Sequence, residues 1–125
     1  MRSGRPRRAD PIPARAVTFG QLARRDTLGG AELRGAVVGL MSLSMRPQIR
    51  LAGLIMTVDE LVVAEGARGA GVGAALIELA KSEARRAGAR RLELLTARGR
   101  PSYSRLFYVK NGFAEVDSAV MRWQG

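Results

Sequence analysis

One continuous segment, from Val62 to Gly88, limits the possible folds most strongly, because an apolar stretch runs through closely spaced glycines straight into an amphipathic helix. Its first part reads VVAEGARGAGVGAALIELA. Apolar side chains then recur at helical spacing at Val72, Leu76, Leu79, Ala80 and Ala84. This spacing predicts a helix over residues 71–87 that Gly88 ends as a C-terminal cap. With a strand expected at 89–97, the segment predicts one right-handed βαβ unit with parallel strands.

The residues before this unit predict more strands, so we expect a mixed α/β (α+β) fold. Residues 34–45 alternate in polarity and carry β-branched side chains, which predicts a strand. Residues 49–64 are almost wholly apolar but are interrupted at Asp59 and Glu60. That pattern favours either one strand with a bulge or two strands joined by a kink. Weak helical spacing predicts a short helix at 18–26.

The residues after the unit predict one more helix and a short pair of strands. Pro101 suits a first helical turn, and a helix over 101–110 is expected to stop at Asn111 and Gly112. Two short strands are expected at 113–116 and 118–123, around a turn at Asp117.

The domain organisation follows from length and composition. The chain has 125 residues, of which 46% are hydrophobic, and that is enough for one small core. Residues 1–16 are rich in Pro and Arg and show no periodicity, so we expect a disordered arm there. We expect residues 17–125 to form a single domain.

The chain contains neither cysteine nor histidine, which removes several kinds of chemistry. Disulfides, thiolate nucleophiles, Ser-His-Asp triads and the usual zinc sites are excluded, and we expect no metal. No apolar run approaches the roughly 20 residues of a membrane span, and the basic N-terminus lacks the apolar core of a secretory signal. We therefore expect a cytoplasmic protein without a membrane partner.

Positive charge dominates the chain, with a net charge of +10. Residues 1–25 hold seven arginines and one aspartate, so they contribute +6. Such a protein attracts phosphates, either of nucleic acid or of a small polyphosphate such as coenzyme A or a nucleotide. Codon usage of a GC-rich genome is the alternative explanation. Nucleic acid is not favoured as a partner, because aromatic residues make up only 5% and none lies within the basic run.

The glycine spacing at 69–73 has several possible meanings. A P-loop needs Lys and then Ser or Thr after its last glycine, where this chain has Val72 or Ala74. A dinucleotide fingerprint is disfavoured, because the acid at the expected distance, Glu93, is followed by more strand. Two readings stay open: a loop whose amides bind a diphosphate at a helix start, and a tight turn whose glycines only allow close packing.

Two motifs, in order and at a fitting distance, resemble the GNAT superfamily of N-acetyltransferases. The first, Arg68 to Gly73, is similar to the family's Arg/Gln-x-x-Gly-x-Gly/Ala signature. The second, Leu106 to Phe113, is similar to the hallmark in which a helix ends in Tyr and Gly-Phe opens a strand. The resemblance covers about residues 34–123.

This resemblance implies a mixed, V-split β-sheet flanked by helices, with acetyl-CoA as cosubstrate in the split. The pantetheine arm would pair with the backbone of Leu61, Val62 and Val63, and Arg68 would open the diphosphate turn. The diphosphate would lie on the amides of Gly69, Ala70, Gly71, Val72, Gly73 and Ala74. The acetyl group would pass directly from sulfur to an amine, without a covalent enzyme intermediate.

Direct transfer needs a neutral amine, a polarised carbonyl and a proton for the leaving thiolate. Tyr108 falls on the family's general acid, with packing beside Phe107 as its alternative role. Glu60 is the candidate base, directly or through water; the alternative is a solvated strand carboxylate, and Asp59 is a weaker candidate. A backbone N–H of Val62 or Val63 would polarise the carbonyl. Ser104 lies one helical turn before Tyr108 and would touch the pantetheine or thiol end.

Two features depart from the family pattern. Pro101 stands where family members often carry an Asn that contacts the cosubstrate. Residues 1–33 are too short for the usual first strand and two helices that wall the acceptor site, so we expect abbreviated N-terminal elements. A homodimer that completes the site is one consequence to consider.

The predicted function is therefore an acetyl-CoA-dependent N-acetyltransferase acting on a primary amine of a small molecule or peptide. The alternatives are a non-catalytic acyl-CoA binding module and, less favoured, a basic nucleic-acid binding protein.

Overall fold

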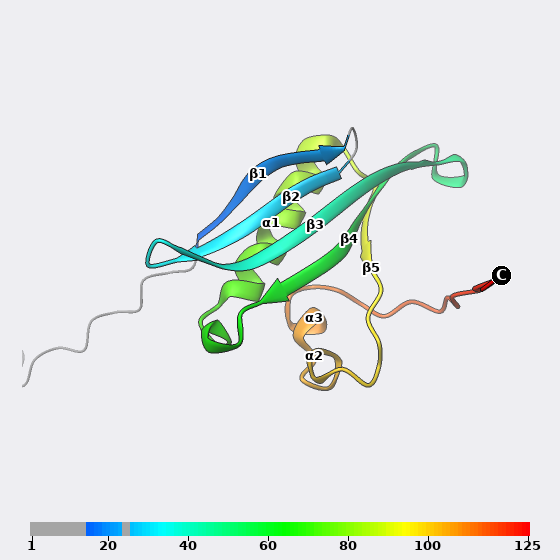
Figure 1. The fold of residues 1–125 in the computed structure, drawn as a ribbon. Helices are drawn as coiled ribbons and strands as arrows, with labels where there is room; N and C mark the ends of the chain where they lie inside the picture. The colour runs from blue at the N-terminus through cyan, green and yellow to red at the C-terminus, as the bar shows by residue number, and fades with distance from the viewer. Residues whose placement is uncertain (1–14, 24–25) are drawn as a thin grey trace, which may run out of the picture. The chain divides into compact units, whose positions relative to one another are not determined.

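The computed structural model describes residues 15–23 and 26–125, which form two compact units, one ending at Leu95 and one beginning at Thr96 (Figure 1). The first unit is a five-stranded sheet in the order β1-β2-β3-β4-β5, with one long helix, α1, against it. Its strands are β1 (Arg15–Ala23), β2 (Asp26–Leu33), β3 (Ala36–Gln48), β4 (Gly53–Val63) and β5 (Arg91–Leu94). Helix α1 is Val72–Ala87, and two 3-10 turns lie at Ile49–Leu51 and Glu65–Ala67.

The pairing of neighbouring strands changes from antiparallel to parallel once across the sheet. Strands β1 to β4 are antiparallel to their neighbours, and β5 runs parallel to β4. The chain crosses between these two strands through α1, as the expected βαβ unit requires. The prediction of a mixed sheet flanked by helices is therefore confirmed.

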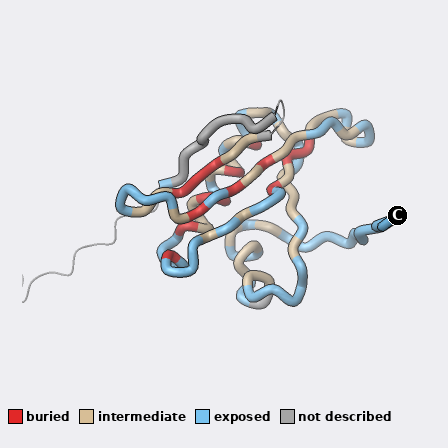
Figure 2. The backbone as a smooth tube through the Cα atoms, viewed as in Figure 1, coloured by how far each residue is buried: buried red, intermediate tan, exposed pale blue. Residues whose placement is uncertain are grey.

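The core of the first unit lies between the sheet and α1, where the buried residues follow β2, β3 and β4 (Figure 2). Helix α1 buries four of the five apolar positions that its sequence spacing predicted, including Leu76 and Ala80 at 0% exposure. Leu79 is only partly buried, and Ile77, which the spacing did not single out, is fully buried. Gly39 lets the helix approach β3 closely, because a Cβ there would lie 2.8 Å from Cγ1 of Val72. Gly88 ends α1 in a left-handed conformation with φ 69°, so the C-cap prediction is confirmed.

Strand β4 is one strand with a bulge. Glu60 pairs with Ser42, but Val58 pairs with the next residue of β3, Leu43, so Asp59 is the extra residue. The bulge preserves the alternation on both sides of Asp59: Val58 and Leu61 both pack against the core around α1. Of the two readings of this segment, the bulged strand is the one observed.

The second unit is built around two single-turn helices, α2 (Pro101–Ser104) and α3 (Phe107–Lys110). The hydroxyl of Tyr103 donates to Oε1 of Glu115 at 3.0 Å, and Arg98 Nε lies 3.5 Å from the same oxygen. These contacts lower the pKa of Glu115, chiefly through the Tyr103 hydrogen bond and then through Arg98. They join the start of the unit to the segment that follows α3.

Four predicted elements are wrong. The helix expected at 18–26 is not formed: residues 18–23 are strand, because β1 pairs with β2 over most of its length and this ladder outweighs a weak helical spacing. The expected helix over 101–110 is broken at Leu106, whose φ of 59° is left-handed. Residues 113–116 and 118–123 are extended but form no strand, since they pair with no strand among the described residues.

The expectation of an arm at 1–16 falls almost wholly on residues 1–14, which lie outside the described residues. The expectation of a single domain over 17–125 stays a prediction. No helix in the described ranges is both long and apolar enough to cross a membrane.

Candidate active site

The glycine-rich turn before α1 presents a row of backbone amides. Within the described part of the chain, five N–H groups there donate to no acceptor; they belong to Gly69, Gly71, Val72, Gly73 and Ala74. The first helical hydrogen bond runs from Ala75 N to Gly71 O, at 3.0 Å. Free amides at a helix start, together with the helix dipole, form a site suited to an anion such as a diphosphate.

Backbone conformation explains two of the glycines. Gly69 has φ 84° and Gly71 has φ 79°, a region in which side chains are strained. A Cβ at either position would meet no atom within 4 Å, so close packing does not require glycine there. The reading of these two glycines as packing glycines is therefore not supported, and the space above the turn is open.

The pairing of β4 with β5 ends before β4 itself ends. The two strands pair only from Ile55 with Arg91 to Val58 with Leu94, where β5 ends. Strand β4 continues to Val63, so its last residues have no strand partner on that side among the described residues. This is the split that the resemblance implied.

Alternation decides which backbone groups of β4 face the split. Ala64 N donates to Val38 O at 2.7 Å, so residue 64 directs its polar groups toward β3, and Val62 does the same. The N–H and C=O groups of Leu61 and Val63 therefore point toward the split. Of the two amides considered for polarising a carbonyl, Val63 has the suitable direction and Val62 does not.

Glu60 lies at the start of this unpaired stretch. Leu61 packs against the core around α1, so Glu60 points to the opposite face of the sheet, where it is exposed. It stands directly opposite Ser42 of β3. Sequence analysis missed Ser42, although its alternation with the buried Met41 and Leu43 places a hydroxyl on the same face as Glu60.

Tyr108 lies in the second unit, on α3. Its half-buried ring makes edge contacts with Phe107 and Phe113, at centroid distances of 5.0 and 6.1 Å. Burial raises the pKa of the Tyr108 phenol above its usual value of 10, against a smaller opposing effect of Arg100. The phenol is therefore protonated at neutral pH, as a proton donor must be.

Ser104 and Tyr108 do not share one helix. Ser104 is the last residue of α2, and the break at Leu106 separates it from α3. The helical spacing that related the two residues in the sequence analysis therefore does not apply. Of the candidate residues, Glu60 to Val63 and Arg68 to Ala74 come together in the first unit, and Ser104 and Tyr108 belong to the second.

Acidic side chains do not form a metal site in the described ranges, where no group of three or more potential ligands is found. The first unit offers backbone amides, the Glu60 carboxylate and the Ser42 hydroxyl, and the second unit offers the protonated Tyr108 phenol.

Comparison with known proteins agrees with this geometry. The sequence profile of the acetyltransferase (GNAT) family matches residues 4–113. An aminoalkylphosphonate N-acetyltransferase of Salmonella typhimurium is 40% identical over 81 residues, which are 65% of this chain and 52% of that protein. The chain thus spans about half the length of this curated relative.

Solved structures share the fold at low sequence identity. A transcriptional regulator from Bacillus halodurans aligns with TM-score 0.73 and 23% identity over 83% of this chain and 69% of its own. A ribosomal-protein-alanine N-acetyltransferase from Brucella melitensis aligns with TM-score 0.66 and 24% identity over 82% and 76%. At these identities the two structures speak for the fold, and the family assignment rests on the profile match over most of the chain: this protein belongs to the acetyltransferase (GNAT) family.

Proposed function

We propose that this protein transfers the acetyl group of acetyl-CoA directly to a primary amine. The observation that carries the proposal is the row of undonated amides at Gly69 and residues 71–74, at the start of α1 and beside the open edge of β4. In a member of the GNAT family, this arrangement suits a cosubstrate with a diphosphate and an amide-containing arm.

The cosubstrate would be held mainly by backbone. The diphosphate lies on the amides of Gly69 and residues 71–74, while the amide of Ala70, which was also expected to bind it, donates to Ala67 O at 3.3 Å. Arg68, which is exposed at the entrance of the turn, adds a positive charge. The amide-containing arm pairs with the polar groups of Leu61 and Val63, while Val62 completes the strand. Ser104 lies near the thiol end.

The chemistry requires one proton donor and one proton acceptor. The amine nitrogen attacks the thioester carbon, its excess proton passes to Glu60 directly or through water, and the C–S bond breaks. Tyr108 then gives its proton to the leaving thiolate, which departs as free CoA thiol.

The acceptor is proposed to be a small amine that also carries an anionic group. A protein with net charge +10 attracts such a molecule, and the Salmonella relative is an aminoalkylphosphonate N-acetyltransferase. A peptide amine is the alternative acceptor. We further propose a cytoplasmic location and, as a partner, a second copy of the chain.

A non-catalytic acyl-CoA binding module is the second candidate function. It is favoured by one observation: Ala23 at the end of β1 pairs with Asp26 at the start of β2, so in the part of the chain that the structure describes no helix lies between these two strands.

Thiol release from acetyl-CoA by the purified protein, measured across a panel of amines, separates the two candidates. The panel contains aminoalkylphosphonates, their uncharged aminoalcohol analogues, polyamines and peptides. The proposal expects CoA release that depends on the amine and is fastest with the phosphonates. Binding of acetyl-CoA without release for any amine would favour the binding module, and no binding at all would overturn both.

A further inference from the structure

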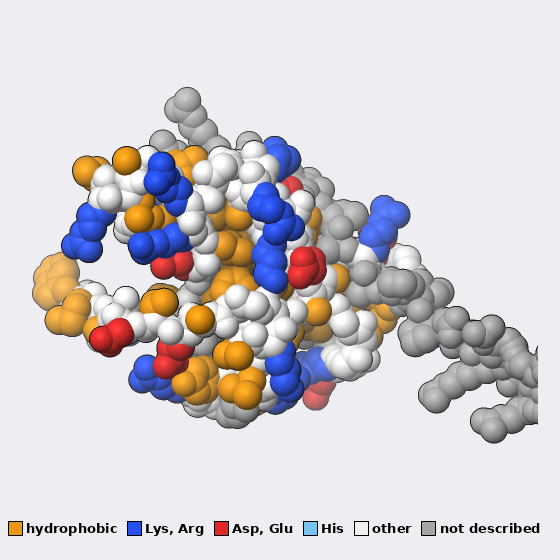
Figure 3. Space-filling view, turned by 180° about the vertical axis from the view of Figure 1, so that it is seen from behind, with side chains coloured by type: hydrophobic (Ala, Val, Ile, Leu, Met, Phe, Trp, Pro, Cys, Tyr) orange, Lys and Arg blue, Asp and Glu red, His pale blue; other side chains and the backbone are white. Residues whose placement is uncertain are grey.

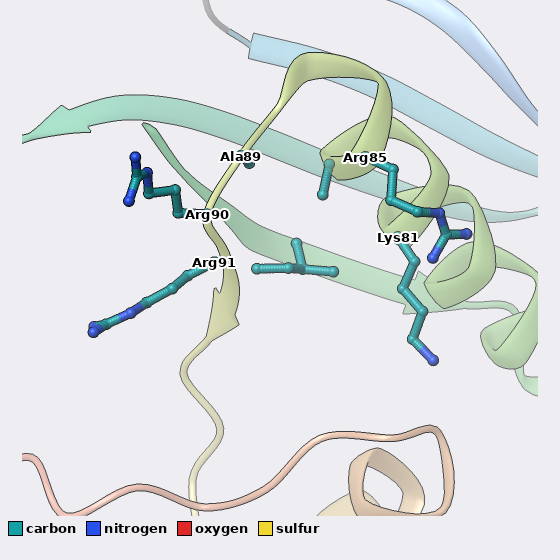
Figure 4. A pocket seen from close by; sticks show the side chains of 7 residues that line it. Lys81, Arg85, Ala89, Arg90 and Arg91 are labelled. Carbon is teal, nitrogen blue, oxygen red and sulfur yellow. The ribbon is translucent and has the colours of Figure 1, made fainter. Parts of the chain in front are cut away.

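A second anion-binding surface lies at the other end of α1, where four cationic side chains surround an open pocket (Figure 4). We propose that this surface binds the phosphodiester backbone of a duplex nucleic acid. We call it the basic edge and define it by Lys81, Arg85, Arg90 and Arg91. Alanines and Leu92 form the rest of the lining.

The cations of the basic edge point in two directions. Lys81 and Arg85 stand one turn apart on α1 and extend to one side, whereas Arg90 and Arg91, at the start of β5, extend to the other (Figure 4). A chain of regularly spaced phosphates that crosses the edge meets one pair and then the other.

Charge at the basic edge is poorly neutralised. Arg85, Arg90 and Arg91 are exposed and form no ion pair with any described residue, while Lys81 is paired with Glu78, at 3.4 Å. Favourable interaction with the helix dipole accounts for Arg85 in the last turn, but not for the two arginines on β5. In Figure 3, which shows the molecule from behind, Lys and Arg side chains gather over its upper half.

Arg90 is held in place by its surroundings. Its N–H donates to Leu54 O at 2.8 Å, and its side chain covers Gly53, where a Cβ would lie 2.7 Å from Cδ and Nε of Arg90. A side chain that is already ordered loses less entropy on binding. Three of the four cations are arginines, whose planar guanidinium binds phosphate in two-pronged fashion.

The lining residues favour duplex over single-stranded nucleic acid. None of them is aromatic, so the surface offers no platform on which unpaired bases could stack. Binding then depends on backbone charge, which is denser on a duplex, and we expect it to be independent of base sequence.

The basic edge is separate from the proposed cosubstrate turn. Helix α1 has 16 residues and the turn precedes its first residue, Val72, while Arg85 lies near its end. At a rise of about 1.5 Å per residue, the two places are roughly 20 Å apart. Substitutions at one end should leave binding at the other unchanged.

The test measures binding of the full chain to a fluorescent 20-base-pair DNA duplex at several salt concentrations. The variant Arg90→Glu/Arg91→Glu removes two proposed contacts. The control Arg15→Glu/Arg34→Glu changes two exposed arginines of the first unit, at the end of the sheet where Arg15 pairs with Glu32, and lowers the net charge by the same amount, from +10 to +6. Arg34 lies in the turn before β3, whereas Gly53, beside Arg90, pairs with Gln48 at the far end of that strand.

We expect the Arg90/Arg91 variant to bind the duplex at least 10-fold more weakly, with a salt slope reduced by about 1.8, that is about 0.9 for each lost phosphate contact. The control variant should change the affinity for the duplex by less than about 3-fold. Acetyl-CoA affinity should be equal in all three proteins. Equal losses in variant and control would show an effect of net charge alone and overturn the proposal. Binding of a polyglutamate peptide as tightly as the duplex would also overturn it.

Discussion

The two compact units offer different kinds of chemical group to the proposed reaction. The first unit offers backbone amides, which the glycine turn at 69–73 and the alternation of β4 put in place. The second unit offers one side chain, the Tyr108 phenol, held among aromatic rings. A backbone group survives most side-chain substitutions and is disturbed by changes of conformation or charge, whereas a side-chain group is lost with a single atom. Activity should therefore tolerate most side-chain substitutions at the backbone groups of the first unit but should be lost when the Tyr108 hydroxyl of the second unit is removed.

The largest effect is expected at Tyr108. Tyr108→Phe keeps the ring and its contacts but removes the proton donor, so turnover should fall by about 10²–10⁴-fold. Acetyl-CoA affinity should stay within about 2-fold of the wild-type value, because binding depends on the first unit. Steady-state kinetics and calorimetry measure the two quantities separately.

Tyr103→Phe is the matched control, since it removes the other tyrosine hydroxyl of the chain. It deletes the hydrogen bond to Glu115, should cost about 1 kcal/mol of unfolding free energy and should leave turnover unchanged. Equal losses of turnover in the two variants would remove Tyr108 from its proposed role.

A negative charge in the turn should have the next largest effect. Ala70→Glu places a carboxylate among the free amides, where it repels the diphosphate and competes for the same donors. Affinity for acetyl-CoA should fall at least about 10-fold, while the fold is kept, because a carboxylate at a helix start is favourable. Ser82→Glu adds the same charge to an exposed position farther along α1 and should bind acetyl-CoA normally. Unchanged affinity of Ala70→Glu would show that the diphosphate lies elsewhere.

Conformation of the turn is tested by Gly71→Ala, with a smaller effect. An alanine at φ 79° should cost about 1–2 kcal/mol, and the melting temperature should fall by several degrees. Gly66→Ala is the control, because Gly66 has no positive φ and open space around it. A melting temperature of Gly71→Ala equal to that of the control would contradict the conformational explanation.

The smallest effect is expected from truncating an exposed side chain of β4. Val62 is 59% exposed, and in the proposal only the backbone of this segment contacts the cosubstrate. Val62→Ala should therefore change acetyl-CoA affinity by less than about 3-fold, equivalent to about 0.6 kcal/mol. A loss as large as that of Ala70→Glu would mean that side chains rather than backbone bind the arm.

The sequence predicted best where local signals agree with each other. Helix α1 and its Gly88 cap could be predicted from apolar periodicity and a glycine at its end, whereas the bulge at Asp59 was one of two readings that the sequence left open. The strand at 15–23 was missed because its partner, not its own pattern, decides its conformation. The break at Leu106 was missed for a related reason: nothing local marks a leucine for a left-handed conformation.

At the candidate site, too, local features could be predicted from the sequence, whereas features that depend on other parts of the chain could not. Gly69 and Gly71 could be singled out from spacing, and the structure adds that conformation rather than packing requires them. Which of the amides of residues 61–63 face the split depends on strand register, which no single strand encodes. The role of Tyr108 depends on how the second unit presents it, so it remains a prediction from the motif.

A crystal structure of the full chain with bound CoA tests the central claim most directly. The account predicts that the diphosphate oxygens lie within hydrogen-bond distance, about 3 Å, of the amides of Gly69 and residues 71–74. It also predicts that the arm pairs with Leu61 and Val63 and that the Tyr108 hydroxyl approaches the sulfur. A CoA molecule bound away from this turn, or a Tyr108 hydroxyl directed away from the sulfur, would contradict it.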